Sequence, residues 1–224
     1  MARQLALDLP VRPALGREAF FVSPANATAL AAIDAWETWP GRRHLLIGPA
    51  GSGKTHLAHV WAALSGARIV PARGLGADDV PALAAAPAVT VEDVDQGTDE
   101  AALFHLLNLA LAEGTPLLLT ATVHPNDRPL GLPDLASRIA AMPVARLQPP
   151  DDTLLQAVLV KLFEDRQVTV APDVISYLLA RIERSLDAAR RTVSVLDTAA
   201  LAERRPVTRQ LARSILDKPG PDSA

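Results

Sequence analysis

The segment GPAGSGKT, residues 48–55, constrains this 224-residue chain more than any other stretch. It fits the pattern G-x-x-x-x-G-K-[ST], it follows the apolar run HLLI, and a segment with helical spacing of apolar residues comes after it. Such a loop between a buried strand and a helix wraps consecutive backbone N–H groups around phosphates, and the helix directs its positive end at the same anion. A chance match in a glycine-rich turn would lack this context. The sequence therefore predicts a phosphate-binding loop in an α/β domain.

Each residue type in this loop has a definite task. Lys54 is expected to reach the β- and γ-phosphates of a nucleotide, and the Thr55 hydroxyl to ligate Mg²⁺. Gly51 and Gly53 supply backbone conformations that a residue with a Cβ rarely adopts. The predicted phosphate-binding residues are Gly48, Pro49, Ala50, Gly51, Ser52, Gly53, Lys54, Thr55 and His56.

A pair of acids follows a second apolar run. In AVTVED, residues 88–93, Glu92 and Asp93 come where a buried strand would end. One carboxylate is expected to hold Mg²⁺, here Glu92 through a water, while the other polarises the attacking water. The alternative is a strand that simply ends in solvated acids. The preceding phosphate-binding loop favours the catalytic interpretation.

The order of apolar runs and helical segments predicts the architecture. Short apolar runs alternate with helical spacing as far as residue 147, which indicates a five-stranded parallel sheet covered by helices on both faces. After QPPDD, residues 148–152, only helical segments remain. We expect an extended tail over residues 1–17, an α/β domain over 18–149 and a small α-helical lid domain over 150–224. One helix is expected from about residue 24 to 39.

Composition excludes several classes of function. The chain has no Cys, so a disulfide framework, a thiolate nucleophile and a Cys-based zinc site are excluded. It has no run of about 18 apolar residues and no secretory signal pattern, which favours a cytoplasmic protein. A net charge of −3 and an aromatic content of 4% do not indicate a general nucleic-acid-binding field or a base-stacking platform.

Two segments besides the loop, and a third at the N-terminus described below, carry a resemblance to a known family. The loop with THLAH behind it, FFVSPANATALAAI (20–33) and LPDLASRIAAMPVARLQPPDD (132–152) resemble the bacterial replication initiator DnaA and its short Hda-type relatives. The resemblance implies a P-loop AAA+ core with a helical lid, binding ADP or ATP with Mg²⁺. It also implies an adenine pocket lined by Phe21, Val22 and Asn26, and a γ-phosphate sensor at Thr122 after the fourth apolar run.

The same resemblance assigns a role to Arg138. In PDLASRIA it matches the family's interface arginine, which acts in trans on a nucleotide held by a neighbouring subunit. A guanidinium supplied to the transition state of phosphoryl transfer accelerates it by roughly 10³–10⁵-fold. Without the resemblance, the simpler interpretation is a surface arginine that pairs with Asp134, four residues earlier on a helix.

The N-terminal segment QLALDL, residues 4–9, resembles the short clamp-binding peptide of Hda-type proteins. Gln4 would make hydrogen bonds, while Leu5, Leu7 and Leu9 would dock into apolar pockets of the DNA polymerase III sliding clamp, the β subunit. The alternative is a tail whose alternating leucines form an edge strand on the body of the protein.

Three departures from the family pattern bear on catalysis. Glu92 stands where the family has Asp, Thr122 is uncharged, and Asp187 falls where the lid normally carries an arginine that contacts the nucleotide. Arg184, Arg190 or Arg191 could take over that role. An acid beside the phosphates is repulsive. Intrinsic hydrolysis is therefore expected to be weak, and the sequence leaves open whether ADP or ATP is the resting ligand.

These features predict a regulator of replication initiation. It would bind nucleotide and the DNA-loaded clamp, stimulate hydrolysis of DnaA-bound ATP and so prevent over-initiation, near the nucleoid and replisome. DNA would be reached indirectly through the clamp, and homo-oligomers are possible. Two alternatives remain: an active ATPase of the helicase-loader type, and a DNA-associated scaffold with a vestigial nucleotide site. The scaffold interpretation depends on a cluster of basic residues, the arginines at 204, 205, 209 and 213.

Overall fold

Five strands form one parallel sheet in the order β2-β3-β4-β1-β5. The computed structural model describes residues 16–124, 127 and 130–217. The strands are β1 (Arg43–Ile47), β2 (Arg68–Pro71), β3 (Val89–Glu92), β4 (Leu117–Ala121) and β5 (Val144–Arg146). The predicted five-stranded parallel sheet is confirmed. Because β1 lies between β4 and β5, the loop that leaves its carboxyl end opens where the strand order reverses, which is the usual ligand position in such sheets.

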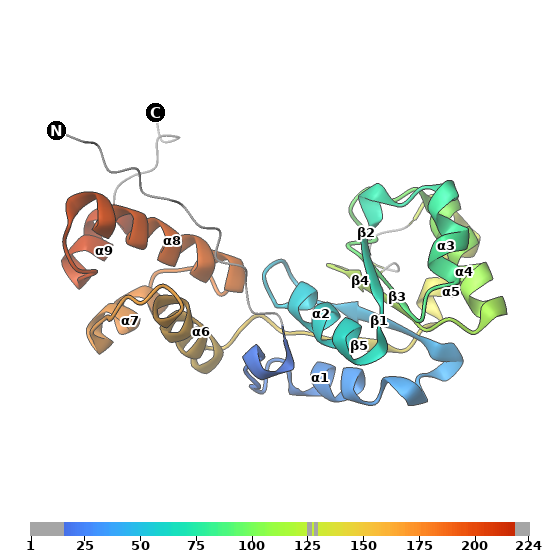
Figure 1. The fold of residues 1–224 in the computed structure, drawn as a ribbon, viewed down its shortest axis with the longest axis horizontal. Coiled ribbons are helices and arrows are strands. Elements are labelled where there is room, and N and C mark those ends of the chain that lie inside the picture. The colour runs from blue at the N-terminus through green and yellow to red at the C-terminus, as the bar shows by residue number, and fades with distance from the viewer. Residues whose placement is uncertain (1–15, 125–126, 128–129, 218–224) are drawn as a thin grey trace.

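Helices cover both faces of the sheet (Figure 1). The helices of this part are α1 (Ala27–Asp34), α2 (Lys54–Ser65), α3 (Val80–Ala84), α4 (Glu100–Glu113) and α5 (Pro133–Ala140). Short 3₁₀ turns span Arg17–Ala19, Trp36–Thr38, Pro40–Arg42, Ala72–Gly74 and Ala77–Asp79.

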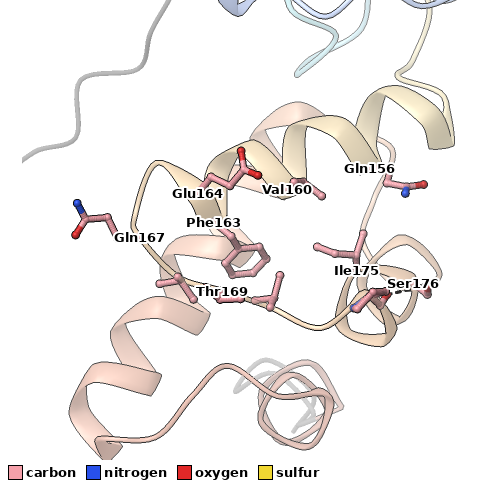
Figure 2. A pocket seen from close by; sticks show the side chains of 11 residues that line it. Gln156, Val160, Phe163, Glu164, Gln167, Thr169, Ile175 and Ser176 are labelled. Carbon is pink, nitrogen blue, oxygen red and sulfur yellow. Dashed lines mark hydrogen bonds between the residues drawn. The ribbon is translucent and has the colours of Figure 1, made fainter.

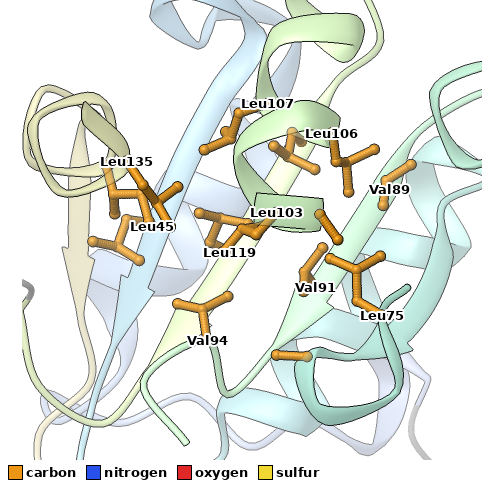
Figure 3. Packing of buried hydrophobic residues seen from close by; sticks show 14 of the residues in the cluster. Leu45, Leu75, Val89, Val91, Val94, Leu103, Leu106, Leu107, Leu119 and Leu135 are labelled. Atoms are coloured by element: carbon orange, nitrogen blue, oxygen red, sulfur yellow. The ribbon is translucent and has the colours of Figure 1, made fainter. Parts of the chain in front are cut away.

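Successive side chains along each strand point to opposite faces of the sheet, and each face packs against a different set of helices. Leu45 and Leu119 point to the face covered by α3, α4 and α5, where they pack with Leu103 (Figure 3). Their neighbours Leu46 and Leu118 point to the face covered by α1 and α2. Both sets are fully buried. The near-continuous apolar runs of these strands therefore follow from helices on both sides.

Four further helices form the lid, drawn to one side of the sheet in Figure 1. They are α6 (Asp152–Glu164), α7 (Pro172–Leu179), α8 (Leu186–Glu203) and α9 (Arg209–Leu216). Side chains at the N-cap positions of α6, α8 and α9 accept backbone N–H groups of the first turn, which fixes where these helices begin. The lid has a core of its own around Leu155, Phe163 and Leu178.

One predicted helix is shorter than expected. The segment expected to be helical from 24 to 39 forms α1 only to Asp34, followed by a 3₁₀ turn. The break lets the chain turn back, so that the Trp39 indole donates to the carbonyl oxygen of Ala32 at 2.8 Å and stacks on Trp61. Tertiary packing of Trp39 therefore overrides the helical pattern.

His44 joins this aromatic cluster and makes stability depend on pH. Its ring stacks on Trp39, it is 6% exposed, and neither ring nitrogen has a hydrogen-bond partner within the described part of the chain. Burial lowers the pKa of His44 from 6.5 to about 4. At pH values between about 4 and 6.5, His44 is protonated in the unfolded chain and stays neutral in the folded protein. Stability is therefore unaffected above pH 6.5 and falls as the pH decreases toward 4.

We expect His44→Phe to remove this dependence while keeping the stack on Trp39. At pH 5 the penalty in the wild type is about 2 kcal/mol relative to pH 7. Urea unfolding of both proteins at pH 7 and pH 5 measures the difference, in which the other titrating groups cancel. Equal losses of stability in the two proteins would contradict the assignment.

Candidate nucleotide-binding site

The loop of residues 48–55 leaves the carboxyl end of β1 and continues into α2. Gly51 and Gly53 have φ values of 68° and 103°, in the left-handed region that favours glycine. Gly48 is required for close packing instead, since a Cβ there would lie 2.6 Å from Ser52 Oγ and 2.8 Å from Leu147 Cβ. The loop therefore has the tight backbone that its sequence predicts.

Lys54 is buried at the centre of this loop. Its Nζ donates to the carbonyl oxygens of Gly48 at 2.8 Å and Pro49 at 3.2 Å. Burial lowers the pKa of Lys54, and nearby carboxylates oppose that shift, with Asp93 contributing most. Hydrogen bonds to these two carbonyl oxygens hold the ammonium group inside the loop, and a phosphate oxygen can take the place of either acceptor.

A cavity of about 400 Å³ opens over the loop. It is lined by three parts of the chain: the loop with the start of α2, the end of β3, and the lid. The lining residues are Ala50, Gly51, Gly53, Lys54, Thr55, His56, Asp93, Gln96, Asp187 and Arg190. Of the predicted loop residues, Gly48, Pro49 and Ser52 shape the loop without lining this cavity, and the Ser52 hydroxyl is buried with no hydrogen-bond partner in the described part.

The two acids after β3 face different surroundings. Asp93 lines the cavity, and its backbone N–H donates to Thr120 Oγ1 at 2.9 Å. Asp93 also has a φ of 57°, an uncommon value for a residue other than glycine. Glu92 is not part of the lining, and its Oε1 is buried without a partner among the described residues. Asp93 is therefore the better placed of the two to face bound phosphates.

Two polar residues that the sequence interpretation missed complete this edge. Asp95 accepts the backbone N–H groups of Thr122 and Val123, at 2.9 and 3.2 Å, and so joins the ends of β3 and β4. Gln96 lines the cavity and donates through Nε2 to Thr122 Oγ1 at 3.4 Å. Thr122 itself is not part of the lining. The signal available was the acid-rich segment EDVDQ, residues 92–96, at the end of a buried strand.

The lid contacts the loop through the start of α8. The backbone N–H of Leu186 donates to the Gly51 carbonyl oxygen at 2.8 Å. Asp187 and Arg190 both line the cavity and form an ion pair with each other at 2.9 Å. The acid that was expected beside the phosphates therefore lines the cavity over the loop, and its charge is neutralised by Arg190. Arg184 pairs with Asp152 and Arg191 with Glu183, and neither lines the cavity.

A narrower cavity of about 70 Å³ lies beside the first, between residues 20–26 and α6. Phe21 and Asn26, two of the three residues predicted to line an adenine pocket, line this cavity together with Phe20, which the sequence interpretation omitted. Phe20 packs edge-on against the His56 ring, with centroids 5.1 Å apart. Val22 is 56% exposed and is not part of the lining.

The Asn26 side chain has a local task. Its Oδ1 accepts the Ser23 backbone N–H at 2.9 Å, and its Nδ2 donates to the Phe21 carbonyl oxygen at 2.8 Å. These bonds close the turn that presents Phe20 and Phe21 to the cavity. Asn26 therefore shapes this wall through the backbone.

Arg138 lies on α5, away from both of these cavities. Its guanidinium carbon is 5.2 Å from the centroid of the Phe104 ring on α4. Glu100, at the start of α4, accepts the N–H groups of Gly131 and Leu132 just before α5. In the part of the chain that the structure describes, no ion pair joins Arg138 to Asp134, so the simpler interpretation of a paired surface arginine is not supported.

The predicted clamp-binding residues Gln4, Leu5, Leu7 and Leu9 lie outside the described residues. Within the described ranges, no group of three or more His, Cys, Asp or Glu side chains is arranged to hold a metal ion by itself. No helix there is long and apolar enough to cross a membrane.

The lid also contains a groove of about 540 Å³ between α6 and α7 (Figure 2). Val160, Phe163 and Ile175 form its apolar wall, and Gln156 and Glu164 lie at its edge. None of its lining residues is cationic. It is therefore unsuited to phosphate groups, and the loop cavity remains the nucleotide-site candidate.

Comparison with known proteins gives a family match for the lid and a likeness in fold for most of the chain. Residues 152–216 match the family described as Hda, lid domain. Domain III of the replication initiation protein DnaA from Thermotoga maritima is 20% identical, with a TM-score of 0.78 over 93% of this chain and 98% of that one. AMPPCP-bound DnaA from Aquifex aeolicus is 17% identical, with a TM-score of 0.66 over 87% of this chain and 71% of that one. The Thermotoga maritima RuvB Holliday junction branch migration motor is 17% identical, with a TM-score of 0.71 over 92% of this chain and 72% of that one.

At these identities the solved structures establish the fold, which is the AAA+ fold with a helical lid. The sheet order and the loop after β1 agree with this fold, which DnaA domain III shares. The lid matches the Hda lid domain over residues 152–216, and this match is confined to that part of the chain.

Proposed function

We propose that this chain binds an adenine nucleotide with its phosphates in the cavity over residues 48–55. The donor set supports this: Lys54 and the N-terminus of α2 supply positive charge, and the buried Ser52 hydroxyl has no partner within the described residues. Thr55 and Asp93 would hold Mg²⁺, while Glu92, which does not line the cavity, would lie farther from the ion. Bound Mg²⁺ would neutralise charge on the phosphate oxygens. The base would lie against Phe20 and Phe21. The cavity there has a volume of only about 70 Å³, so the lid would have to move outward slightly to admit the base.

We propose further that the chain regulates replication initiation by stimulating hydrolysis of ATP bound to DnaA. The observation that carries this proposal is the position of Arg138, which lines neither of its own nucleotide cavities and has no carboxylate partner among the described residues. Its helix is fixed by buried Leu135 and Ile139 and by the Glu100 contacts. A rigidly mounted, unpaired guanidinium suits transition-state charge on a neighbour's nucleotide.

The proposal includes a tether and named partners. DnaA is the substrate-bearing partner, because the Hda-type lid and the DnaA-like fold point to that system. Residues 4–9 would bind the sliding clamp, and a clamp on DNA would raise the local concentration of this protein near DnaA. The place of action would be the cytoplasm, at the replisome.

The test is single-turnover hydrolysis of labelled ATP already bound to DnaA. We expect acceleration when this protein is added with DNA-loaded clamp, and much less when the clamp is omitted. If the chain leaves DnaA-bound ATP untouched but hydrolyses free ATP itself, the regulator proposal fails and an ATPase of the helicase-loader type replaces it. Asp93 and Lys54 in one cavity are the observation that favours this second candidate.

We expect substitutions of Asp187 and Arg190 to change nucleotide affinity in opposite directions. Both side chains line the phosphate cavity, and each restrains the other. Asp187→Ala removes a repulsive acid and releases Arg190, so binding of ADP and ATP should tighten about tenfold. Arg190→Ala leaves the acid unneutralised and should weaken binding by a similar factor. Equilibrium titration with a fluorescent ADP measures both, with Arg191→Ala on the same helix as the control. Changes of the same sign in the two variants would contradict the assignment.

A further inference from the structure

Helices α7 and α9 pack together at the end of the lid farthest from the sheet (Figure 1), and three arginines of this region line one surface cavity. Arg181 follows α7, while Arg209 and Arg213 stand one turn apart on α9. With Tyr177 and Gln210 they line a surface cavity of about 410 Å³. Leu211 and Ala212 are buried on the opposite side of α9, so the arginines form its exposed face.

The guanidinium groups are arranged before any ligand arrives. Arg181 stacks on the Tyr177 ring at 3.9 Å, and Arg209 lies 5.5 Å from the same ring. Tyr177 is itself 5% exposed, and its hydroxyl donates to Asp217 at 3.0 Å. A buried ring held at both ends is a rigid platform. Less side-chain entropy is therefore lost when the arginines bind an anion.

The cluster keeps an excess of positive charge. Asp217 accepts from Arg213 at 3.3 Å and lies 3.5 Å from Arg181, so one carboxylate serves two arginines. Arg209 has no carboxylate within ion-pair distance among the described residues. Three cations and one anion leave a net charge of +2 on this small surface, although the chain as a whole carries −3.

The chemistry selects the ligand. Guanidinium forks bind phosphate oxygens through two parallel hydrogen bonds, and two arginines four residues apart on one helix match a row of anions. Single-stranded nucleic acid is normally held by aromatic stacking on its bases. Tyr177 is buried and covered by Arg181, so no exposed ring is available for bases. Duplex DNA offers the phosphate row without requiring stacking.

We infer that this surface, formed by Arg181, Arg209 and Arg213, binds the phosphate backbone of duplex DNA directly and without sequence preference. In the proposed function the clamp encircles DNA, and this contact would orient the far end of the lid on that same duplex. Only this last role rests on the proposed function. The binding itself belongs to the isolated chain.

The test is binding of a short fluorescent duplex by the full chain alone, without clamp or DnaA, across salt concentrations. Three phosphate contacts predict a slope of about −2.7 in log affinity against log salt, or about 40-fold weaker binding at 200 mM than at 50 mM. The double variant Arg209→Gln with Arg213→Gln should flatten the slope by about two. Arg191→Gln, which removes an exposed arginine from α8 of the same lid, should leave it unchanged.

Two further measurements keep the interpretation sharp. Affinity for fluorescent ADP must be unchanged in the double variant, since the nucleotide site lies at the other end of the lid, and this shows that the variant is folded. Polyglutamate of equal charge should compete poorly with the duplex, because carboxylates do not reproduce the phosphate row. Absence of binding at 50 mM salt, an equal loss in Arg191→Gln, or equal competition by polyglutamate would each overturn the inference. A failure of DnaA stimulation with intact DNA binding would overturn the proposed function alone.

Discussion

Arg138→Ala is expected to reduce stimulation of DnaA-bound ATP hydrolysis by about 10³-fold, the lower end of the range for an arginine supplied in trans. The reason is that hydrolysis passes through a transition state whose charge is spread over the phosphoryl oxygens, and the guanidinium stabilises that charge. The side chain lies on Phe104 at the protein surface and supports no buried charge. Its removal should therefore leave stability within about 0.5 kcal/mol.

The experiment is the single-turnover assay with DNA-loaded clamp and a matched control on the same helix. Asp134→Ala removes the acid one turn before Arg138 and should retain full stimulation. If Arg138 were only a surface partner of Asp134, both variants would behave alike. Nucleotide affinity of this chain should be unchanged in Arg138→Ala, because the residue lines neither nucleotide cavity. Full stimulation by Arg138→Ala would remove the basis of the regulator proposal.

The α/β architecture could be predicted because its strands are buried on both faces. Runs such as LLLTA in β4 have no polar face, so they read as continuous apolar segments between helical ones. The lid was predicted from helical spacing alone. Its sequence also carries capping residues, since Asp151, Ser185 and Thr208 stand at the starts of α6, α8 and α9. These signals depend only on residues that are close together in the chain, so they can be recognised in a single sequence.

The phosphate-binding loop was predictable for the same reason, but the lid side of the site was not. Which of four charged residues on or beside α8 faces the loop depends on how the helix is rotated against another domain. The hydrogen bond from Leu186 to Gly51 fixes that rotation, and it places Asp187 with Arg190 at the cavity. The family resemblance placed Asp187 at the position of the lid arginine and left open which of Arg184, Arg190 and Arg191 could take over that role.

Long-range contacts also account for the other omissions. Phe20 joins the base-side cavity because His56, 36 positions later, packs against it. Asp95 joins two strands through the backbone of Thr122 and Val123. In each case the deciding partner belongs to a different element, and no periodicity in the sequence reports it.

Gly51→Ala is expected to separate the lid from the phosphate-binding loop. A Cβ at this position would lie 2.0 Å from Ser185 Oγ and 3.0 Å from Ser185 Cβ, and the φ of 68° already disfavours a side chain. Rotation of the Ser185 hydroxyl would relieve the first contact, but Ser185 Cβ and the Asp187 backbone N, at 3.3 Å, would stay too close. We therefore expect the start of α8 to move away and the Leu186 N–H bond to the Gly51 carbonyl oxygen to break. Arg190 and the α6 wall then leave the site. Loss of such charge-assisted contacts should weaken ADP binding by about tenfold to a hundredfold.

Gly114→Ala supplies the matched control for Gly51→Ala. Gly114 has a φ of 72°, and nothing lies within 4 Å of a Cβ built there, so this variant carries the backbone strain without the collision. Both variants should lose about 1–2 kcal/mol of stability from that strain in urea unfolding. Only Gly51→Ala should lose ADP affinity, and only it should lose hydrogen-exchange protection at the Leu186 amide. Retained protection in Gly51→Ala, or equal loss of affinity in both, would mean that the contact between α8 and the loop does not hold the lid in place.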